Sequence, residues 1–205
     1  MLETMKANTS ANRAAAITQC VAQGGDLNTT DNGGWSPLHW AVVNGDLAAA
    51  EALVVAGANV NTRDGDGATP LATTMILNAS DPDIAIPFLR LFAGAGADLN
   101  AVDEYNETPL SHATGFHAAL PVVNALLAAG ADPNIVLPNG RTALYPTIQA
   151  QCLSDIGIAL LDAGADPTRM DPLKLDLFTR ATRILCTDSL RDRTYHDRVT
   201  ELVNK

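Results

Sequence analysis

The sequence predicts an all-α solenoid of stacked helix-turn-helix units. Two signals recur in phase along its 205 residues. The first is a Ser or Thr, then Pro or Ala, then Leu, beginning at Ser36, Thr69, Thr108 and Thr142. The second is Gly-Ala-Asn or Gly-Ala-Asp, beginning at Gly57, Gly96, Gly130 and Gly164. Both recur at steps of 33 to 39 residues, and such a period indicates a repeat protein whose units contact mainly their neighbours.

The unit at residues 31–63 shows why the units must stack. Ser36 can cap its first helix, and Pro37 fits the first helical position, where a missing N–H costs nothing. Gly45 and Gly57 can adopt the left-handed conformation that ends each helix. Isolated helices of fewer than about 12 residues are marginal in water, so neighbouring units have to cover both helices.

The chain is expected to form six units. They are an N-terminal capping repeat at 1–30, repeats at 31–63, 64–102, 103–136 and 137–170, and a helical C-terminal cap at 171–205. The repeat at 64–102 holds six extra residues near 78–83, and the one at 137–170 is degenerate.

Local residues refine these units. The loop-type residues at 78–83 predict a longer turn between two helices, with Pro87 opening the second helix. Pro146 predicts a short or kinked first helix in the fourth repeat. In the C-terminal cap, apolar residues that include Leu173, Leu177 and Tyr195 have the spacing of two amphipathic helices.

The charge balance favours a basic protein as the partner. The net charge is −10, and residues 1–170 hold 17 acidic against 6 basic residues. This disfavours nucleic acid and anionic membranes as partners. No signal peptide or membrane span is evident, so a cytoplasmic location is expected. Cys20, Cys152 and Cys186 are far apart and lack CxxC spacing, which predicts reduced, buried cysteines and no zinc site.

The pattern D-x-x-G-x-S/T-P-L-H, followed by G-A-x-x-N, resembles the ankyrin repeat. The match is strongest at 31–63 and absent in both flanks. The resemblance implies a curved stack with finger-like loops, used for protein recognition, with no catalytic residues. In this family the histidine of the motif is structural and bonds between loops. Only His39 keeps it, whereas Ala72, Ser111 and Tyr145 replace it, so the later repeats should be less rigidly joined.

By the ankyrin pattern, certain side chains point away from the stack and are candidates for protein binding. They are Asn32, Trp35, Val43, Asn44, Arg63, Asp66, Ile76, Leu77, Glu104, Tyr105, Glu107, Phe116, Arg141 and Gln149. Trp35 and Tyr105 are expected on finger tips, where aromatic residues favour binding. Alternatively, Ile76, Leu77 and Phe116 pack on an adjacent unit or under the extra residues at 78–83.

No catalytic, cofactor-binding or metal-binding residues are assigned. The four histidines, His39, His112, His117 and His196, show no converging arrangement. No GxSxG, phosphate-binding loop, GxGxxG or HExxH motif occurs. The run Asp64-Gly65-Asp66-Gly67 fails as a calcium loop because Ala68 and Met75 stand where oxygen ligands are needed.

These features predict a non-enzymatic module that binds a basic protein through its concave face and finger loops, and that is a monomer when free. A narrower version is a stoichiometric inhibitor, such as the immunity protein of a basic toxin or nuclease; a scaffold or a secreted effector has similar requirements. The alternatives are an enzyme or small-ligand site formed by residues 78–83 with His117, Asp81 and Asp83, and an array that self-associates through its caps.

Overall fold

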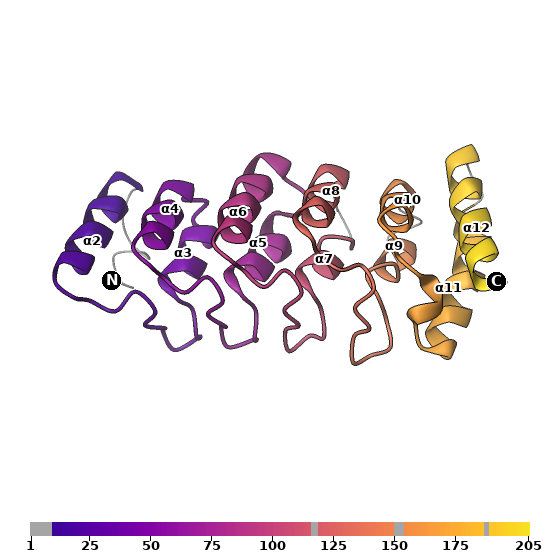
Figure 1. Ribbon diagram of the computed structural model, residues 1–205, viewed down its shortest axis with the longest axis horizontal. Helices are drawn as coiled ribbons and strands as arrows, with labels where there is room; N and C mark the ends of the chain where they lie inside the picture. Colours follow the sequence, from indigo (N-terminus) through magenta and orange to yellow (C-terminus); the bar gives the residue numbers. More distant parts are fainter. Residues whose placement is uncertain (1–9, 116–118, 150–153, 187–188) are drawn as a thin grey trace.

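The computed structural model describes residues 10–115, 119–149, 154–186 and 189–205, and it is a single row of paired helices (Figure 1). The pairs are α3 (Pro37–Val43) with α4 (Leu47–Val55), α5 (Pro70–Asn78) with α6 (Pro82–Gly94), α7 (Pro109–His112) with α8 (Leu120–Ala129), and α9 (Pro146–Gln149) with α10 (Ser154–Asp162). The flanking elements are α2 (Ser10–Ala22), η1 (Pro167–Arg169), α11 (Pro172–Leu185) and α12 (Leu190–Val203). The described residues contain no strand, and the predicted all-α solenoid is confirmed.

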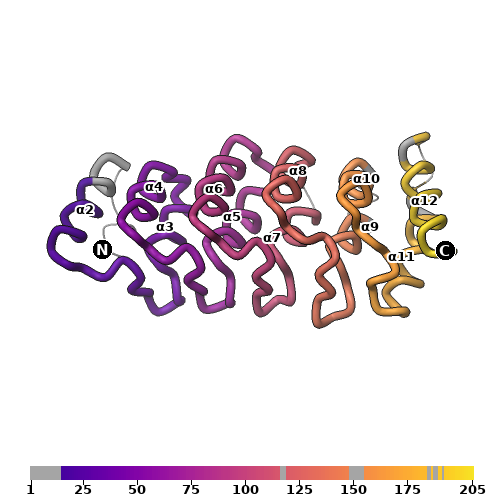
Figure 2. The backbone as a smooth tube through the Cα atoms, viewed as in Figure 1, coloured from indigo at the N-terminus to yellow at the C-terminus, as the bar shows by residue number. Residues whose placement is uncertain are grey.

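The helices form two layers (Figures 1 and 2). The second helices of the pairs make one layer, which α2 and α12 continue at its two ends. The first helices make the other layer, and hairpin loops extend beyond it like fingers. Within the stack, α2 packs on α4 and α12 packs on α10, so both ends of the row are covered by helices.

The recurring Ser/Thr-Pro signal starts the first helices as predicted. The Thr69 hydroxyl accepts a hydrogen bond from the Ala72 N–H at 3.2 Å, and the Thr108 hydroxyl accepts one from the Ser111 N–H at 3.2 Å. The proline that follows each threonine occupies the first turn. These caps satisfy N–H groups that a helix N-terminus would otherwise leave without partners.

A ladder of asparagine side chains joins the loops that follow the second helices. Its rungs are Asn59 N to Asn28 Oδ1 at 2.7 Å, Asp98 N to Asn61 Oδ1 at 2.7 Å, Asp132 N to Asn100 Oδ1 at 2.9 Å, and Asp166 N to Asn134 Oδ1 at 2.8 Å. The ladder runs from residue 28 to residue 166. The loop before the first full repeat therefore stacks in the same way as the loops after it.

The six extra residues of the second repeat lie within its helices. α5 has nine residues where α3 has seven, and α6 has 13 where α4 has nine. The intervening turn is equally long in both repeats, at 44–46 and 79–81. The predicted longer turn is wrong, and so is a helix opening at Pro87, which lies inside α6. The loop-type residues misled the prediction because Asp81 caps α6, accepting a hydrogen bond from the Asp83 N–H at 3.1 Å.

In the fourth repeat the first helix starts late. Thr142 stands where Thr69 and Thr108 cap helices, yet α9 begins at Pro146 and residues 143–145 form a turn. A proline disfavours the helical conformation in the residue before it, which here is Tyr145. Pro146 therefore shortens the helix at its N-terminal end, and it opens the helix where the sequence pattern had placed it inside.

The C-terminal cap consists of two helices, as predicted, but only some of its apolar residues face the stack. Phe178, Tyr195 and Val199 are fully buried, and the rings of Phe178 and Tyr195 meet edge to face with centroids 6.4 Å apart. Leu173 and Leu177 are 64% and 42% exposed, which corrects the expectation that they form the apolar face of α11. The face of α11 that packs inward is centred on Phe178.

The cysteines differ from the expectation of three reduced thiols. Cys20 is free and half-buried, whereas Cys186 is buried and disulfide-bonded. Cys152 lies outside the described residues. Separation in sequence is a poor guide to cysteine pairing in a stacked array, because stacking brings distant residues together.

Candidate protein-binding site

In the first three repeats, the aspartate that begins the finger holds the finger turn together. In the second finger, Asp64 Oδ1 accepts hydrogen bonds from the N–H groups of Asp66 at 3.0 Å and Ala68 at 2.9 Å. In the third finger, Asp103 Oδ1 accepts from Tyr105 at 2.9 Å and Glu107 at 3.0 Å. One carboxylate oxygen thus fixes the turn, and the other is left to face the helices.

Consecutive fingers touch through their backbones. The Gly65 N–H donates to the Gly33 carbonyl at 2.7 Å, and the Glu104 N–H donates to the Asp66 carbonyl at 2.9 Å. A Cβ placed on Gly34 would lie 2.5 Å from Gly65 N, and Gly34 has a φ of 77°. Glycine is therefore required there both by its backbone conformation and by the close approach of the next finger.

His39 joins the first repeat to the second. Its Nδ1 accepts from the Ser36 N–H at 3.1 Å, and its Nε2 lies 3.1 Å from the Ala68 carbonyl oxygen. This pattern requires the neutral imidazole that carries its proton on Nε2. Burial lowers the pKa of His39, because the charged form is poorly solvated in the core. The structural role expected for this histidine is confirmed.

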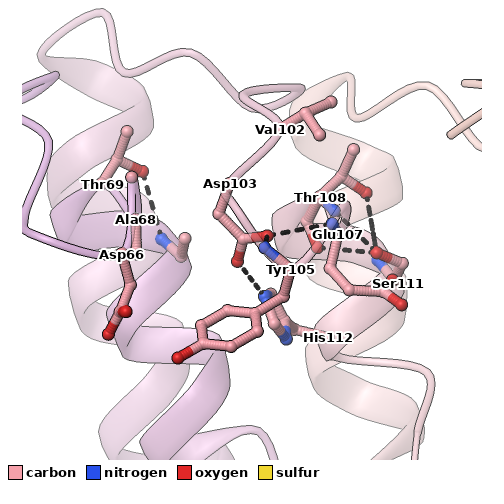
Figure 3. A network of polar contacts seen from close by, with 12 residues as sticks. Asp66, Ala68, Thr69, Val102, Asp103, Tyr105, Glu107, Thr108, Ser111 and His112 are labelled. Carbon is pink, nitrogen blue, oxygen red and sulfur yellow. Dashed lines mark hydrogen bonds and ion pairs between the residues drawn. The ribbon is translucent and has the colours of Figure 1, made fainter. Parts of the chain in front are cut away.

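A ring from the first helix reaches the second carboxylate oxygen of the finger aspartate in two repeats. In the first, Trp40 Nε1 donates to Asp31 Oδ2 at 3.0 Å. In the third, His112 Nε2 lies 2.6 Å from Asp103 Oδ2 (Figure 3), and the Asp103 side chain is only 1% exposed. In both cases the ring lies nine positions after the aspartate. Finger and helix are thereby tied together within one repeat.

A groove of about 300 Å³ lies between the fingers and α5. Side chains from three repeats line it: Trp35, Asp64, Asp66, Ala68, Thr73, Ile76, Leu77, Tyr105 and His112. Ile76 and Leu77 are 47% and 50% exposed, and Tyr105 is 60% exposed. The groove therefore combines accessible apolar walls with two carboxylates.

Tyr105 reaches from the third finger towards the second. Figure 3 shows its ring extending from the finger turn towards the side of the array where Asp66 lies. A hydrogen bond to the Asp66 carboxylate raises the pKa of the Tyr105 hydroxyl, and the negative charge of Asp66 adds to this effect. The Tyr105 ring and the Asp66 carboxylate together form one edge of the groove.

The family model for ankyrin repeats, in three copies, matches residues 5–85. Residues 5–85 are therefore ankyrin repeats. Beyond residue 85, the asparagine ladder and the capped helix pairs continue the same architecture. No curated protein matches the chain. Ankyrin repeats are typically non-catalytic modules for protein interaction, so a protein partner follows from the family.

Five of the candidates chosen from the ankyrin pattern meet in the groove: Trp35, Asp66, Ile76, Leu77 and Tyr105. Tyr105 lies in a finger turn as expected. Trp35 does not lie at a tip, because its ring packs at 5.2 Å from Trp40 and 6.4 Å from His39 and is half-buried. Trp35 lines the groove with its exposed edge, and the rest of its ring packs against Trp40 and His39 of its own repeat.

Other candidates are engaged by the fold itself. Arg63 Nη1 donates to the carbonyls of Gly67 and Val102, each at 2.7 Å, and so bridges two repeats. Asn44 donates to the Trp40 carbonyl at 2.6 Å. The Arg141 guanidinium lies 4.3 Å from the centroid of the Tyr145 ring. These side chains strengthen the array and lie outside the groove.

The remaining candidates do not line the groove. Asn32, Val43 and Glu104 are exposed, and Glu107 is half-buried. Phe116 and the side chain of Gln149 lie outside the described residues, as does His117 of the alternative ligand site. Asp81, also assigned to that alternative, is the N-cap of α6.

Four groove residues were missed from the sequence: Asp64, Ala68, Thr73 and His112. Asp64 is the first residue of its repeat and holds the finger turn, so nothing in the sequence marks it as a groove residue. The signal that could have identified Thr73 and His112 is their position nine residues after a finger aspartate, where Trp40 also stands.

A second hollow, of about 710 Å³, lies in the C-terminal cap between α11 and α12. Arg180, Arg183 and His196 line it together with Asp176, which pairs with Arg180 at 3.1 Å. Its basic lining contrasts with the acidic groove. Over the described part of the chain, no three His, Cys, Asp or Glu side chains are grouped to hold a metal ion, and no helix is long and apolar enough to cross a membrane.

Proposed function

We propose that the protein binds a basic protein partner through the groove and the adjoining fingers, and that it does so without catalysis. The observation that carries this proposal is the convergence of candidates. Five side chains selected by their ankyrin positions, from three different repeats, line one groove. Exposed apolar side chains gathered in one place are typical of an interaction site.

The charges of the groove support a basic partner. Asp64 and Asp66 line it, and the chain as a whole carries a net charge of −10. Complementary charge steers association and selects partners more than it raises affinity. Aromatic residues such as Trp35 and Tyr105 supply the anchoring contacts that dominate many interfaces.

Capture of partners from a native lysate, at low and high salt, tests this proposal. Tyr105→Ala and Ile76→Asp change exposed groove side chains and should each weaken retention of a basic partner about tenfold or more. Val55→Asp is the matched control, because Val55 is 89% exposed on α4 and does not line the groove. Retention that is equal in all three variants, or that does not fall with salt, would contradict the proposal.

We further propose that the protein is a monomer and that it binds neither nucleic acid nor membranes. Light scattering tests the oligomeric state, gel shift tests binding to nucleic acid, and vesicle sedimentation tests binding to membranes. Inhibition is tested by assaying the captured partner with and without the protein, and loss of the partner's activity at one-to-one stoichiometry would establish it.

A cytoplasmic location is also part of the proposal, and Cys186 argues against it. Disulfides persist mainly in oxidising compartments, and Cys186 is disulfide-bonded. Thiol alkylation after rapid acid quenching of cells decides between the two. A Cys186 that is alkylated without prior reduction supports the cytoplasm, whereas one that needs reduction first places the protein elsewhere.

A further inference from the structure

The second repeat departs from a pairing rule that the first and third repeats obey. In those repeats, Asp31 and Asp103 use Oδ1 for the finger turn and Oδ2 for a ring N–H nine positions later, from Trp40 and His112. Every oxygen of these two carboxylates therefore has a donor. The ring also fills the space between finger and helix.

In the second repeat the aspartate is kept and the ring is missing. Asp64 Oδ1 holds the finger turn as usual, but the residue nine positions later is Thr73. Threonine is too short to cross the space that an indole or imidazole spans. Thr73 is only 4% exposed, and its hydroxyl has no hydrogen-bond partner among the described residues. A buried polar group without a partner is costly and calls for an explanation.

The fourth repeat lacks both the aspartate and the ring. Leu137 replaces the aspartate and Pro146 stands nine positions later, so the acid and the ring are lost together. Leu137 is buried at 3% exposure, as a hydrophobic side chain should be. The second repeat alone, of these four, keeps the acceptor without its internal donor.

The position between Asp64 and Thr73 borders the groove. Asp64 and Thr73 both line it, with the side chains of Trp35, Ile76, Leu77 and Tyr105 around them. A ligand group entering there meets the Asp64 carboxylate between aromatic and aliphatic walls, and the unpartnered Thr73 hydroxyl lies covered directly beneath this surface. The second carboxylate, Asp66, lines the same groove.

We propose that this groove receives an arginine side chain of the protein partner, an inference that rests on the proposed function. The guanidinium occupies the place that the rings of Trp40 and His112 hold in the neighbouring repeats. It donates to Asp64 Oδ2 and to the Thr73 hydroxyl oxygen, and its methylene groups lie against Ile76 and Leu77. Arginine fits better than lysine, because it is planar like the two rings, carries several N–H donors and stacks on aromatic faces.

The first test uses the peptide acetyl-Gly-Arg-Gly-amide, titrated into the ¹⁵N-labelled protein and followed by NMR. The amides of Ala68 and Thr73 and the indole of Trp35 should shift together. The same peptide with citrulline keeps the shape and loses the charge, and it should bind about tenfold more weakly, as loss of a charge-assisted hydrogen bond implies. The lysine peptide should also bind more weakly than arginine. Equal binding of arginine and citrulline peptides, or shifts confined to other parts of the array, would overturn the proposal.

The second test fills the vacant position. Thr73→His introduces the residue that the third repeat uses, so it should raise the melting temperature and weaken the arginine peptide about tenfold. Thr73→Val keeps the shape and removes the hydroxyl, so it should weaken the peptide without lowering the melting temperature. If Thr73→His does not fold, Asp64→Asn replaces it, because the amide keeps an oxygen for the finger turn and loses the charge. Unchanged peptide affinity in Thr73→Val and in either of the others contradicts the proposal.

The same variants separate this inference from the proposed function. If Tyr105→Ala loses the natural partner while Thr73→His retains it, the groove binds a partner but not through an arginine at Thr73, and this inference fails alone. If both variants retain the partner, the proposed site itself is wrong. Loss in both, with Val55→Asp unaffected, supports both.

Discussion

The two ends of the array are held together by different forces. Between residues 31 and 112, polar groups join one repeat to the next, as His39 does by reaching the Ala68 carbonyl and Arg63 by reaching Val102. At the C-terminal end, a buried aromatic side chain adds to the polar links between units. The Tyr195 ring is buried against Phe178 and Gly157, and its hydroxyl lies 3.0 Å from that of Thr147.

The difference teaches that the stack tolerates loss of its sequence signals when packing replaces them. In the third repeat, Ser111 takes the place of the motif histidine and its hydroxyl accepts from the Thr108 N–H at 2.7 Å. Ser111 thereby satisfies the same helix start as His39 does, but its side-chain bonds stay within one repeat. The link that His39 makes to the next repeat thus has no counterpart at Ser111, although the asparagine ladder still joins the third repeat to the fourth.

The largest expected effect is at the aromatic end. In Gly157→Ala the new Cβ would lie 2.4 Å from the Tyr195 ring, and Tyr195 is fully buried and cannot move aside. We expect a loss of about 3 kcal/mol in unfolding free energy, measured by urea denaturation. Gly94→Ala is the control, because its Cβ would meet nothing within 4 Å; it should be neutral or slightly stabilising. Similar losses in both would show that the contact with Tyr195 does not set the effect.

The next effect is at the polar end. His39→Leu leaves the Ser36 N–H and the Ala68 carbonyl buried without their partner and should cost about 2 to 3 kcal/mol. Ser111→Ala, at the equivalent position, removes only bonds within one repeat and should cost less. Denaturation of both variants, followed by circular dichroism, measures the two losses of unfolding free energy. A larger loss for Ser111→Ala would contradict the view that a bond to the next repeat stabilises the array more than bonds within one repeat.

A smaller loss is expected at the finger aspartate. His112→Leu removes the donor from the buried Asp103 Oδ2 and should cost about 1 to 2 kcal/mol. Thr73→Val, at the equivalent position of the second repeat, removes a hydroxyl that has no partner and should cost nothing. Melting temperatures of the two variants give the comparison. If Thr73→Val is the more destabilising, the second repeat contains a bond that its geometry does not reveal.

The smallest effect is a pH dependence at His39. Burial lowers its pKa below the ordinary value of 6.5, so below pH 6.5 the unfolded chain takes up the proton and the folded protein does not. Stability is therefore full above pH 6.5 and falls as the pH drops towards the lowered pKa, by at most about 1.4 kcal/mol per pH unit. NMR of the imidazole tests this directly, since a His39 ring that titrates at or above 6.5 would reverse the sign.

Most of the fold was predictable, because repeated signals report local needs that recur. The Thr-Pro pairs start helices, the Gly-Ala-Asn and Gly-Ala-Asp runs end them, and His39 has the role that its motif implies. The prediction failed at residues 78–83, because aspartate and proline serve a helix N-terminus as well as they serve a loop. It also failed at Leu173 and Leu177, where spacing alone could not show which face of α11 is covered.

The groove was only partly predictable. Ile76 and Tyr105 were found because they are apolar side chains at positions that point outward. Thr73 was missed, since its importance lies in what it lacks beside Asp64, and a missing partner becomes visible only when the repeats are superimposed. Arg63 does not line the groove, because its long side chain turns back to carbonyls of its own array.

The longer helices of the second repeat distinguish it from the other units. Repeats that are alike can stack out of order or exchange between copies during folding, a failure typical of such arrays. Here α6 is longer than the other second helices of the paired repeats, and the turn before it accepts a hydrogen bond from the Ala119 N–H at 3.1 Å, just before α8. Through this hydrogen bond the lengthened second repeat is matched to the third repeat.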